Sequence, residues 1–128
     1  MALWTFRCFL SQSGRDLVDD WYAELPIKAR VKLDSLIEHF RDNPHHKWGS
    51  NYLKPLTGYS GIFEIRFQIL NVVYRPLGYF GPRRNDFTFL IGAREQGDDW
   101  VPANAPDRAV ERRQIVELNE DRAHECDF

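Results

Sequence analysis

The sequence predicts an α+β protein: a small curved antiparallel β-sheet packed against an N-terminal helical hairpin, with a C-terminal helix. Three observations predict this class. Large apolar residues alternate with polar ones over residues 63–69, which is typical of a strand with one buried face. Two apolar stripes with helical spacing precede this strand, and a helix-start pattern at 104–107 follows it. The 128 residues contain no repeat and no linker, so we expect one domain over 1–128.

The first third of the chain predicts one strand and two helices. Residues 4–10 alternate large apolar side chains with mixed ones, as a strand does. Apolar residues then recur at helical spacing over 17–25 and again over 33–40. Pro26 closes the first helix and suits the first turn of the second, which ends at Asp-Asn-Pro in 42–44. Two helices joined at one proline are expected to pack as a hairpin.

The middle of the chain predicts the sheet. Residues 61–69 and 72–79 are expected to pair through a two-residue turn at 70–71. A turn at 80–86 leads to a third, largely buried strand over 87–93.

The last part of the chain predicts a helix and a tail. Asn104 is the expected cap, Pro106 lies in the first turn, and Asp107 lies near the positive end of the helix dipole. The helix should run to about Leu118. The acidic tail over 118–128 is expected to fray.

The charge balance looks unlike that of a nucleic-acid-binding protein, because 17 basic and 19 acidic residues give a net charge of −2. The charges are segregated, however. Residues 1–44 carry −1, residues 45–94 carry +5, and residues 95–128 carry −6. A basic central stretch between neutral and acidic flanks is therefore compatible with an anionic partner.

Several classes of protein are excluded. No apolar run reaches the roughly 18 residues that a membrane-spanning helix needs, and the N-terminus does not resemble a signal peptide. Without such a signal we expect Cys8 and Cys126 to be reduced thiols in a cytoplasmic protein, with a disulfide between the two ends as the alternative. No Cys/His set has zinc spacing, and His45-His46 predicts a solvated loop. We therefore expect no metal, no cofactor and no membrane partner.

The predicted hairpin has a register that places Arg66 opposite Arg75. Two facing arginines cost of order 0.2–1 kcal/mol unless an anion lies between them. The alternative is that Arg66 pairs with Glu64 or another acid as an ordinary surface contact. Lys54 before the sheet and Arg94 just after the third strand would add two further cations to one exposed surface. Separated cations on a rigid sheet suit an RNA backbone, and they could stabilise a cleavage transition state without a metal.

Short motifs recur in a particular order along this part of the chain. They are Leu53-Lys-Pro-Leu-Thr-Gly58, Gly61-Ile-Phe-Glu-Ile-Arg66, Val73-Tyr-Arg75, Phe89-Leu-Ile-Gly-Ala-Arg-Glu95, and Pro102 or Pro106 ahead of Ala109 and Arg112-Arg113. Their order and spacing resemble the RelE/ParE toxin superfamily, and most closely its HigB-like, phage-derived branch, over roughly residues 15–116. The resemblance implies a toxin of a type II toxin–antitoxin system that cleaves messenger RNA in the translating ribosome. It also implies a cognate antitoxin, of the helix-turn-helix type.

The resemblance also implies site residues. Arg66 falls on the arginine that binds the scissile phosphate, Arg75 on the second arginine, and Arg94 on the basic residue after the last strand glycine. Lys54 falls among the upstream lysines of the family and is an expected phosphate-binding residue. Independently of the resemblance, Arg83 and Arg84 are expected to bind phosphate as well.

The chain departs from the family in its acid–base group. Such enzymes often carry a tyrosine or histidine in the C-terminal segment, yet no tyrosine follows Arg94 and the only late histidine is His124. Trp100 stands where a tyrosine would be expected. Tyr79 and His46 are the substitutes that we predict for general acid–base work.

Three functions are left open. The first is a ribosome-dependent endoribonuclease, and the second is a ParE-like inhibitor of DNA gyrase. The third is a binding module that keeps the toxin scaffold without its catalysis, which the low charge and the missing acid–base group favour. The acidic tail suggests one further hypothesis, in which it folds across the Arg66/Arg75 face and competes with RNA or antitoxin.

Overall fold

The computed structural model describes residues 2–128 and confirms an α+β fold. Its three α-helices are α1 (Leu17–Ala23), α2 (Ile27–Arg41) and α3 (Ala105–Leu118), with two short 3₁₀ turns, η1 (His45–Lys47) and η2 (Glu120–Arg122). The strands are β1 (Thr5–Phe9), β2 (Leu53–Pro55), β3 (Phe63–Ile65), β4 (Phe67–Ile69), β5 (Val72–Tyr74), β6 (Leu77–Phe80), β7 (Asp86–Ile91), β8 (Arg94–Gln96), β9 (Asp99–Val101) and β10 (Ala123–Glu125). None of the helices in the described part of the chain could cross a membrane.

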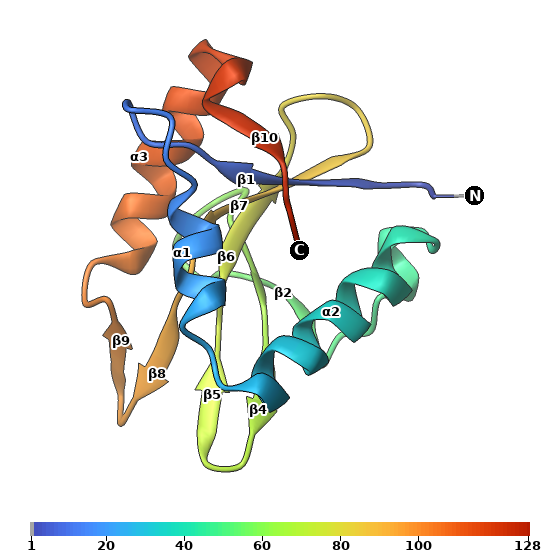
Figure 1. Cartoon of the computed structure of the whole chain (residues 1–128), viewed down its shortest axis with the longest axis vertical. Coiled ribbons are helices and arrows are strands. Elements are labelled where there is room, and N and C mark those ends of the chain that lie inside the picture. Colours follow the sequence, from blue (N-terminus) through green and yellow to red (C-terminus); the bar gives the residue numbers. More distant parts are fainter. Residues whose placement is uncertain (1) are drawn as a thin grey trace.

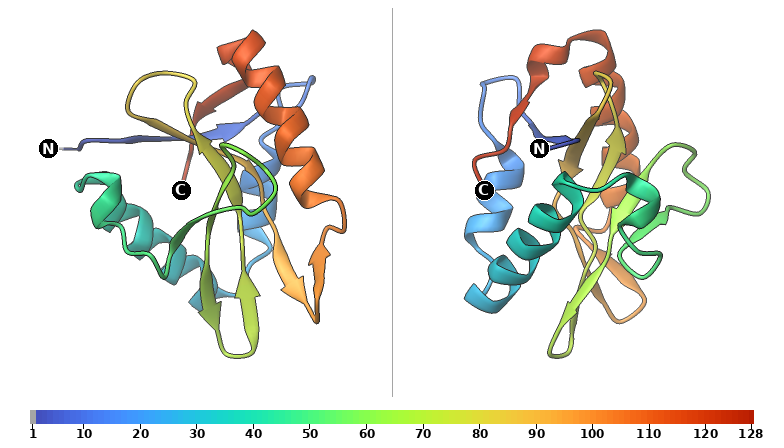
Figure 2. Two further views of the ribbon diagram at one scale, coloured as in Figure 1. Left: turned by 180° about the vertical axis from the view of Figure 1, so that it is seen from behind. Right: turned by 90° about the vertical axis from the view of Figure 1, so that its right-hand side faces the viewer.

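The strands form a three-layered arrangement with the helices (Figure 1). A six-stranded sheet has the order β10-β1-β7-β6-β3-β2, and a four-stranded sheet has the order β4-β5-β8-β9. Helices α1 and α2 cover one face and α3 covers the other (Figure 2). One part of the prediction is wrong: β1 pairs with β7 in parallel, so the larger sheet is mixed. Because β1 and β7 are far apart in the sequence, helices and strands can form the long crossover that a parallel pair needs.

Each face of the sheet has its own apolar core. Phe6, Phe87 and Phe89 project towards α2, where fully buried Trp48 stacks on Phe40. Leu77, Leu90, Ala105 and Ala109 belong to the core beneath α3. Strand β7 serves both cores because its successive side chains point to opposite faces, which explains why all six of its residues are buried.

The two predicted N-terminal helices are present. Asp16 caps α1 by accepting a hydrogen bond from the backbone N–H of Asp19 at 2.8 Å. Pro26 is the N-cap of α2 and thereby separates the two helices. The pKa of Asp19 is raised, first by burial and then by the negative charges of Asp16 and Asp127.

The predicted register is confirmed where β4 meets β5. Phe67 lies opposite Tyr74, and Gln68 lies opposite Val73, across the turn at 70–71. The two strands predicted over 61–69 and 72–79 are nevertheless each divided in two, the first at Arg66 and the second at 75–76. Pro76 has no N–H to donate to the ladder, and the N–H of Arg66 instead bonds to the carbonyl of Tyr52 at 2.6 Å. The chain therefore turns away at this point, which splits the expected single sheet into two.

The C-terminal segment is ordered, so the prediction of a frayed tail is wrong. After η2, strand β10 pairs antiparallel with β1, and Cys126 forms a disulfide with Cys8 across a sequence separation of 118 residues. The expectation of two reduced thiols is therefore also wrong. The tail occupies the β1 edge of the larger sheet, at the other end of the strand order from β3, so it does not fold across the Arg66/Arg75 face as the sequence suggested. The cytoplasmic location stays a prediction, and a disulfide is more typical of oxidising compartments.

The last aromatic ring adds a further attachment. Phe128 stacks on Tyr22 of α1 with ring centroids 4.2 Å apart. We expect Phe128→Ala to lower the free energy of unfolding by about 1 kcal/mol, because the stacking and part of the burial are lost. Urea unfolding followed by tryptophan fluorescence would measure this. The matched control is Leu118→Ala, since that side chain is 90% exposed and its loss should change little; equal effects of the two would contradict the stacking role.

Candidate active site

An ion-pair cluster forms where the two sheets separate. Strand β8 brings Glu95 between the two arginines that the sequence singled out. The Nη1 of Arg66 lies 3.1 Å from Oε1 of Glu95, and the Nη1 of Arg75 lies 3.2 Å from the same oxygen. The predicted proximity of the two arginines is therefore present, and a carboxylate of the protein itself lies between them.

Arg75 has two further partners. Its Nε donates to Oε2 of Glu64, and its guanidinium lies 3.9 Å from the centroid of the Trp100 ring. The Glu64 and Arg75 side chains are only 5% and 18% exposed, whereas Arg66 is 37% exposed. Arg75 is thus fixed by a charge-assisted hydrogen bond and a cation–π contact. Arg66 is the arginine that can reach a ligand in solution.

The alternative stated for Arg66, pairing with an acid, holds in the structure, although the acid is Glu95. With Lys54 opposite Glu64 in the β2–β3 pair, the cluster has three cations and two carboxylates. Its formal charge is therefore +1, less basic than the four converging cations that we expected. We call these five residues, Lys54, Glu64, Arg66, Arg75 and Glu95, the arginine–glutamate cluster.

A pocket of about 330 Å³ adjoins the arginine–glutamate cluster. Glu64 and Arg75 form part of its wall, together with Tyr59 and Trp100. The N-terminal turn of α3 closes it with Pro106 and Asp107. A pocket with two aromatic side chains, a guanidinium and carboxylates can accommodate a nucleotide-sized group.

Arg94 does not join this cluster. It precedes Glu95 in β8, and successive side chains of a strand point to opposite faces. Its side chain lines a small hollow with Trp21, Glu24 and Tyr74 at the junction of α1 and α2. The expected convergence of Arg94 with Arg66 and Arg75 is therefore wrong.

Arg83 and Arg84 are exposed in the turn between β6 and β7, at the far end of β6 from Arg75. Arg83 pairs with Glu120 at 3.0 Å and holds the pKa of that carboxyl below its ordinary value. Neither arginine belongs to the arginine–glutamate cluster. Only a long RNA segment could therefore contact Arg66 and also reach Arg83 and Arg84.

The two predicted acid–base residues lie elsewhere. Tyr79 is 1% exposed in the core beneath α3, and burial raises the pKa of its hydroxyl. Its nearest charged groups include Glu117 and Arg113 rather than the arginine–glutamate cluster. His46 is exposed in η1, beyond the C-terminal end of α2. Neither placement supports an acid–base role beside Arg66.

Glu95 and Trp100 had no assigned role in the predicted site, although Trp100 was noted in place of a tyrosine. Strands β8 and β9 form a hairpin that places Glu95 opposite Trp100, with Gly97 at a φ of +61° in its turn. The Gly-Asp-Asp stretch at 97–99 is a turn signal that could have revealed this hairpin. Glu95 was visible only as the last residue of a motif.

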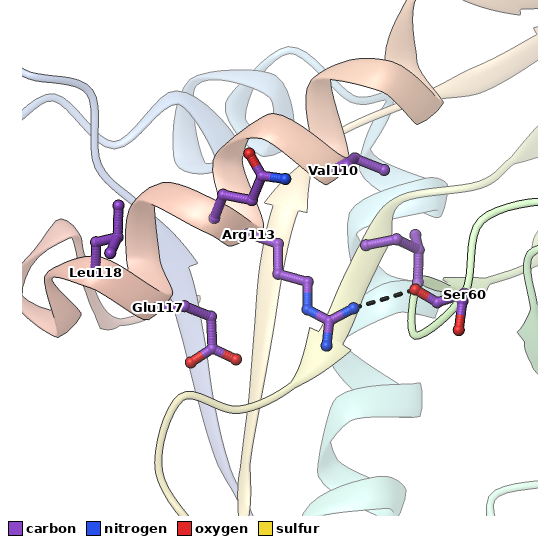
Figure 3. A pocket seen from close by; sticks show the side chains of 7 residues that line it. Ser60, Val110, Arg113, Glu117 and Leu118 are labelled. Carbon is purple, nitrogen blue, oxygen red and sulfur yellow. Dashed lines mark hydrogen bonds between the residues drawn. The ribbon is translucent and has the colours of Figure 1, made fainter.

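A second hollow lies between α3 and the loop that precedes β3, and it has a volume of about 470 Å³ (Figure 3). Arg113 crosses it and donates a hydrogen bond to the carbonyl of Ser60 at 3.1 Å. Gly61 adopts a φ of +79° beside this guanidinium, where a Cβ would lie 2.2 Å from Nη1. None of the predicted site residues lines this hollow.

The fold and the site define a three-layered α+β protein with an arginine–glutamate cluster where its two sheets separate. Comparison with protein-family models, curated proteins and solved structures gives no match. The RelE/ParE resemblance therefore rests on the sequence motifs, and the function that it implies is a proposal.

Proposed function

We propose that the protein is a toxin of a type II toxin–antitoxin system that cleaves messenger RNA in the ribosome. The observation that carries this proposal is the Oε1 atom of Glu95, which lies within 3.2 Å of both the Arg66 and the Arg75 guanidinium. A carboxylate held between two guanidinium groups combines a proton acceptor with two stabilisers of phosphate charge. Metal-independent RNA cleavage requires these two capabilities.

The reaction follows from this arrangement. The Glu95 carboxylate takes the proton of a ribose 2′-hydroxyl, and the 2′-oxygen forms a bond to the adjacent phosphorus. Arg66 and Arg75 stabilise the negative charge that develops on the phosphate oxygens. The bond from phosphorus to the 5′-oxygen breaks, and that oxygen takes a proton from water. The remaining hydroxide takes the proton from Glu95, which restores the carboxylate. The products are a 2′,3′-cyclic phosphate and a 5′-hydroxyl end.

The substrate must displace part of an internal ion pair. Phosphate binding at Arg66 competes with Glu95, so free RNA should bind weakly. The ribosome would supply the additional contacts and the distorted mRNA backbone. A cognate antitoxin with acidic residues would compete for the same guanidinium groups.

Arg66→Ala tests the proposal because this side chain is the more exposed arginine. We expect the rate of ribosome-dependent cleavage to fall about 10²-fold and growth inhibition to disappear. Sequencing RNA ends after induced expression would measure the cleavage, and circular dichroism would check the fold. Arg75→Lys should also impair cleavage, since lysine keeps the charge but loses the forked donors.

Arg15→Ala is the matched control, because Arg15 is an exposed arginine that pairs with Asp20 and lies outside the arginine–glutamate cluster. It should cleave as the unmodified protein does. Undiminished toxicity of both Arg66→Ala and Arg75→Lys would refute the proposal. Uncut RNA together with DNA damage would indicate a ParE-like gyrase inhibitor instead.

A non-catalytic binding module is the second candidate function. It is favoured by the internal neutralisation of Arg75, which already contacts Glu64, Glu95 and Trp100. This function requires a specific partner but no RNA cleavage. Two results together would support the binding module over the endoribonuclease. RNA ends would stay intact, and a bound partner would be lost in Arg66→Ala.

A further inference from the structure

Three side chains with metal-binding atoms meet beside α1, away from the arginine–glutamate cluster. They are Asp16, just before α1, and His124 and Asp127 in the C-terminal segment. Each side chain offers one ligand atom, and these three atoms lie within 4.8 Å of one another. Oδ2 of Asp16 is 2.6 Å from Nε2 of His124. The C-terminal segment runs beside α1 in the right-hand view of Figure 2.

Independent parts of the fold hold these side chains. Oδ1 of Asp16 caps α1, which leaves Oδ2 directed at His124. His124 lies in β10 opposite Cys8 of β1, and the disulfide at Cys126 fixes the backbone immediately before Asp127. Since the residues are already close and restrained, little conformational entropy would be lost when a ligand joins them.

The charge of the surroundings favours a cation. Asp19 in the first turn of α1 adds to the negative charge of Asp16 and Asp127, whereas Asp20 is paired with Arg15. Within residues 2–128, no lysine or arginine lies within 4.0 Å of a carboxylate oxygen of Asp16 or Asp127. His124 is the ion-pairing partner of Asp16, and its side chain is 38% exposed, so the cluster can exchange ions with solvent.

We propose that Asp16, His124 and Asp127 form a binding site for a divalent first-row transition metal, of which Zn²⁺ fits best. One imidazole nitrogen and two carboxylate oxygens are ligands that Zn²⁺ takes at about 2.0–2.2 Å, with water in the fourth position. Nε2 of His124 gives up its hydrogen bond with Asp16 and donates its lone pair to the ion instead. The ion joins the start of α1 to the C-terminal segment and adds to the effect of the disulfide.

Isothermal titration of the full, disulfide-bonded chain with Zn²⁺ tests this site. We expect one ion per chain and a rise in the melting temperature that a chelator reverses. Asp16→Asn should weaken binding at least tenfold while keeping the helix cap, because asparagine is also a good N-cap residue. Asp127→Asn and His124→Gln should weaken it similarly.

His46→Gln is the matched control, since His45 and His46 provide another pair of imidazoles in the described chain. It should bind Zn²⁺ as the unmodified protein does. Titration with Co²⁺ should give a spectrum without thiolate-to-metal charge transfer, which excludes binding by reduced Cys8 and Cys126. Absence of stoichiometric binding, unchanged affinity in all three ligand variants, or loss of binding in His46→Gln would overturn the proposal.

Discussion

Glu95→Gln is expected to reduce RNA cleavage by about 10²–10⁴-fold and to strengthen RNA binding at the same time. The first effect follows because the amide cannot accept the proton of the 2′-hydroxyl. The second follows because the neutral side chain no longer competes with phosphate for Arg66 and Arg75, both of which contact Oε1 of Glu95. Opposite changes in cleavage and binding distinguish a catalytic carboxylate from one that only neutralises two arginines.

Single-turnover cleavage of ribosome-bound mRNA would measure the rate. Fluorescence anisotropy with a short single-stranded RNA at several salt concentrations would measure binding, whose salt dependence should become steeper. Glu111→Gln is the matched control, because Glu111 is exposed on α3 and makes none of these contacts. Unchanged cleavage would exclude Glu95 as the base, and weaker RNA binding would exclude phosphate contact at the arginines.

Removal of the disulfide is expected to have the largest effect on stability. Cys8→Ala combined with Cys126→Ala should lower the free energy of unfolding by about 2–5 kcal/mol, because the bond closes a loop of 118 residues. For a domain of this size the melting temperature should then fall by roughly 6–25 °C. Alanine is chosen because Cys8 is fully buried and a serine hydroxyl there would need a hydrogen-bond partner.

The reduced unmodified protein is the control for this double variant. The reduced protein keeps both cysteine side chains and lacks only the cross-link. Its free energy of unfolding should therefore fall by less than that of the double variant, which also loses the packing of the two side chains. Chemical unfolding under oxidising and reducing conditions would provide the comparison. Equal unfolding midpoints of the oxidised and reduced chains would show that noncovalent contacts hold the C-terminal segment without the disulfide.

Much of the local structure was predictable. The apolar stripes gave α1 and α2, and Pro26 and Pro106 marked helix starts that the structure contains. The turn at 70–71 predicted the pairing of Phe67 with Tyr74. These features depend on residues close together in the sequence, so their patterns determine them.

The site was predicted only in part. The proximity of Arg66 and Arg75 followed from one hairpin register, but the position of Glu95 depended on how β8 leaves the sheet. Arg94 was misplaced because a single residue decides which face of a strand a side chain occupies. The hairpin of β8 and β9, which carries Trp100 to Arg75, also escaped prediction.

The amino-acid pattern alone predicts an α+β protein with two N-terminal helices, the register of one hairpin, and two arginines close together in the sheet. The packing of distant segments places Glu95 between those arginines, joins Cys8 to Cys126, and brings Asp16 to His124. These three contacts join residues that are far apart along the chain. Local periodicity fixes which face of a helix or strand is buried, whereas contacts between distant residues depend on how whole elements pack together.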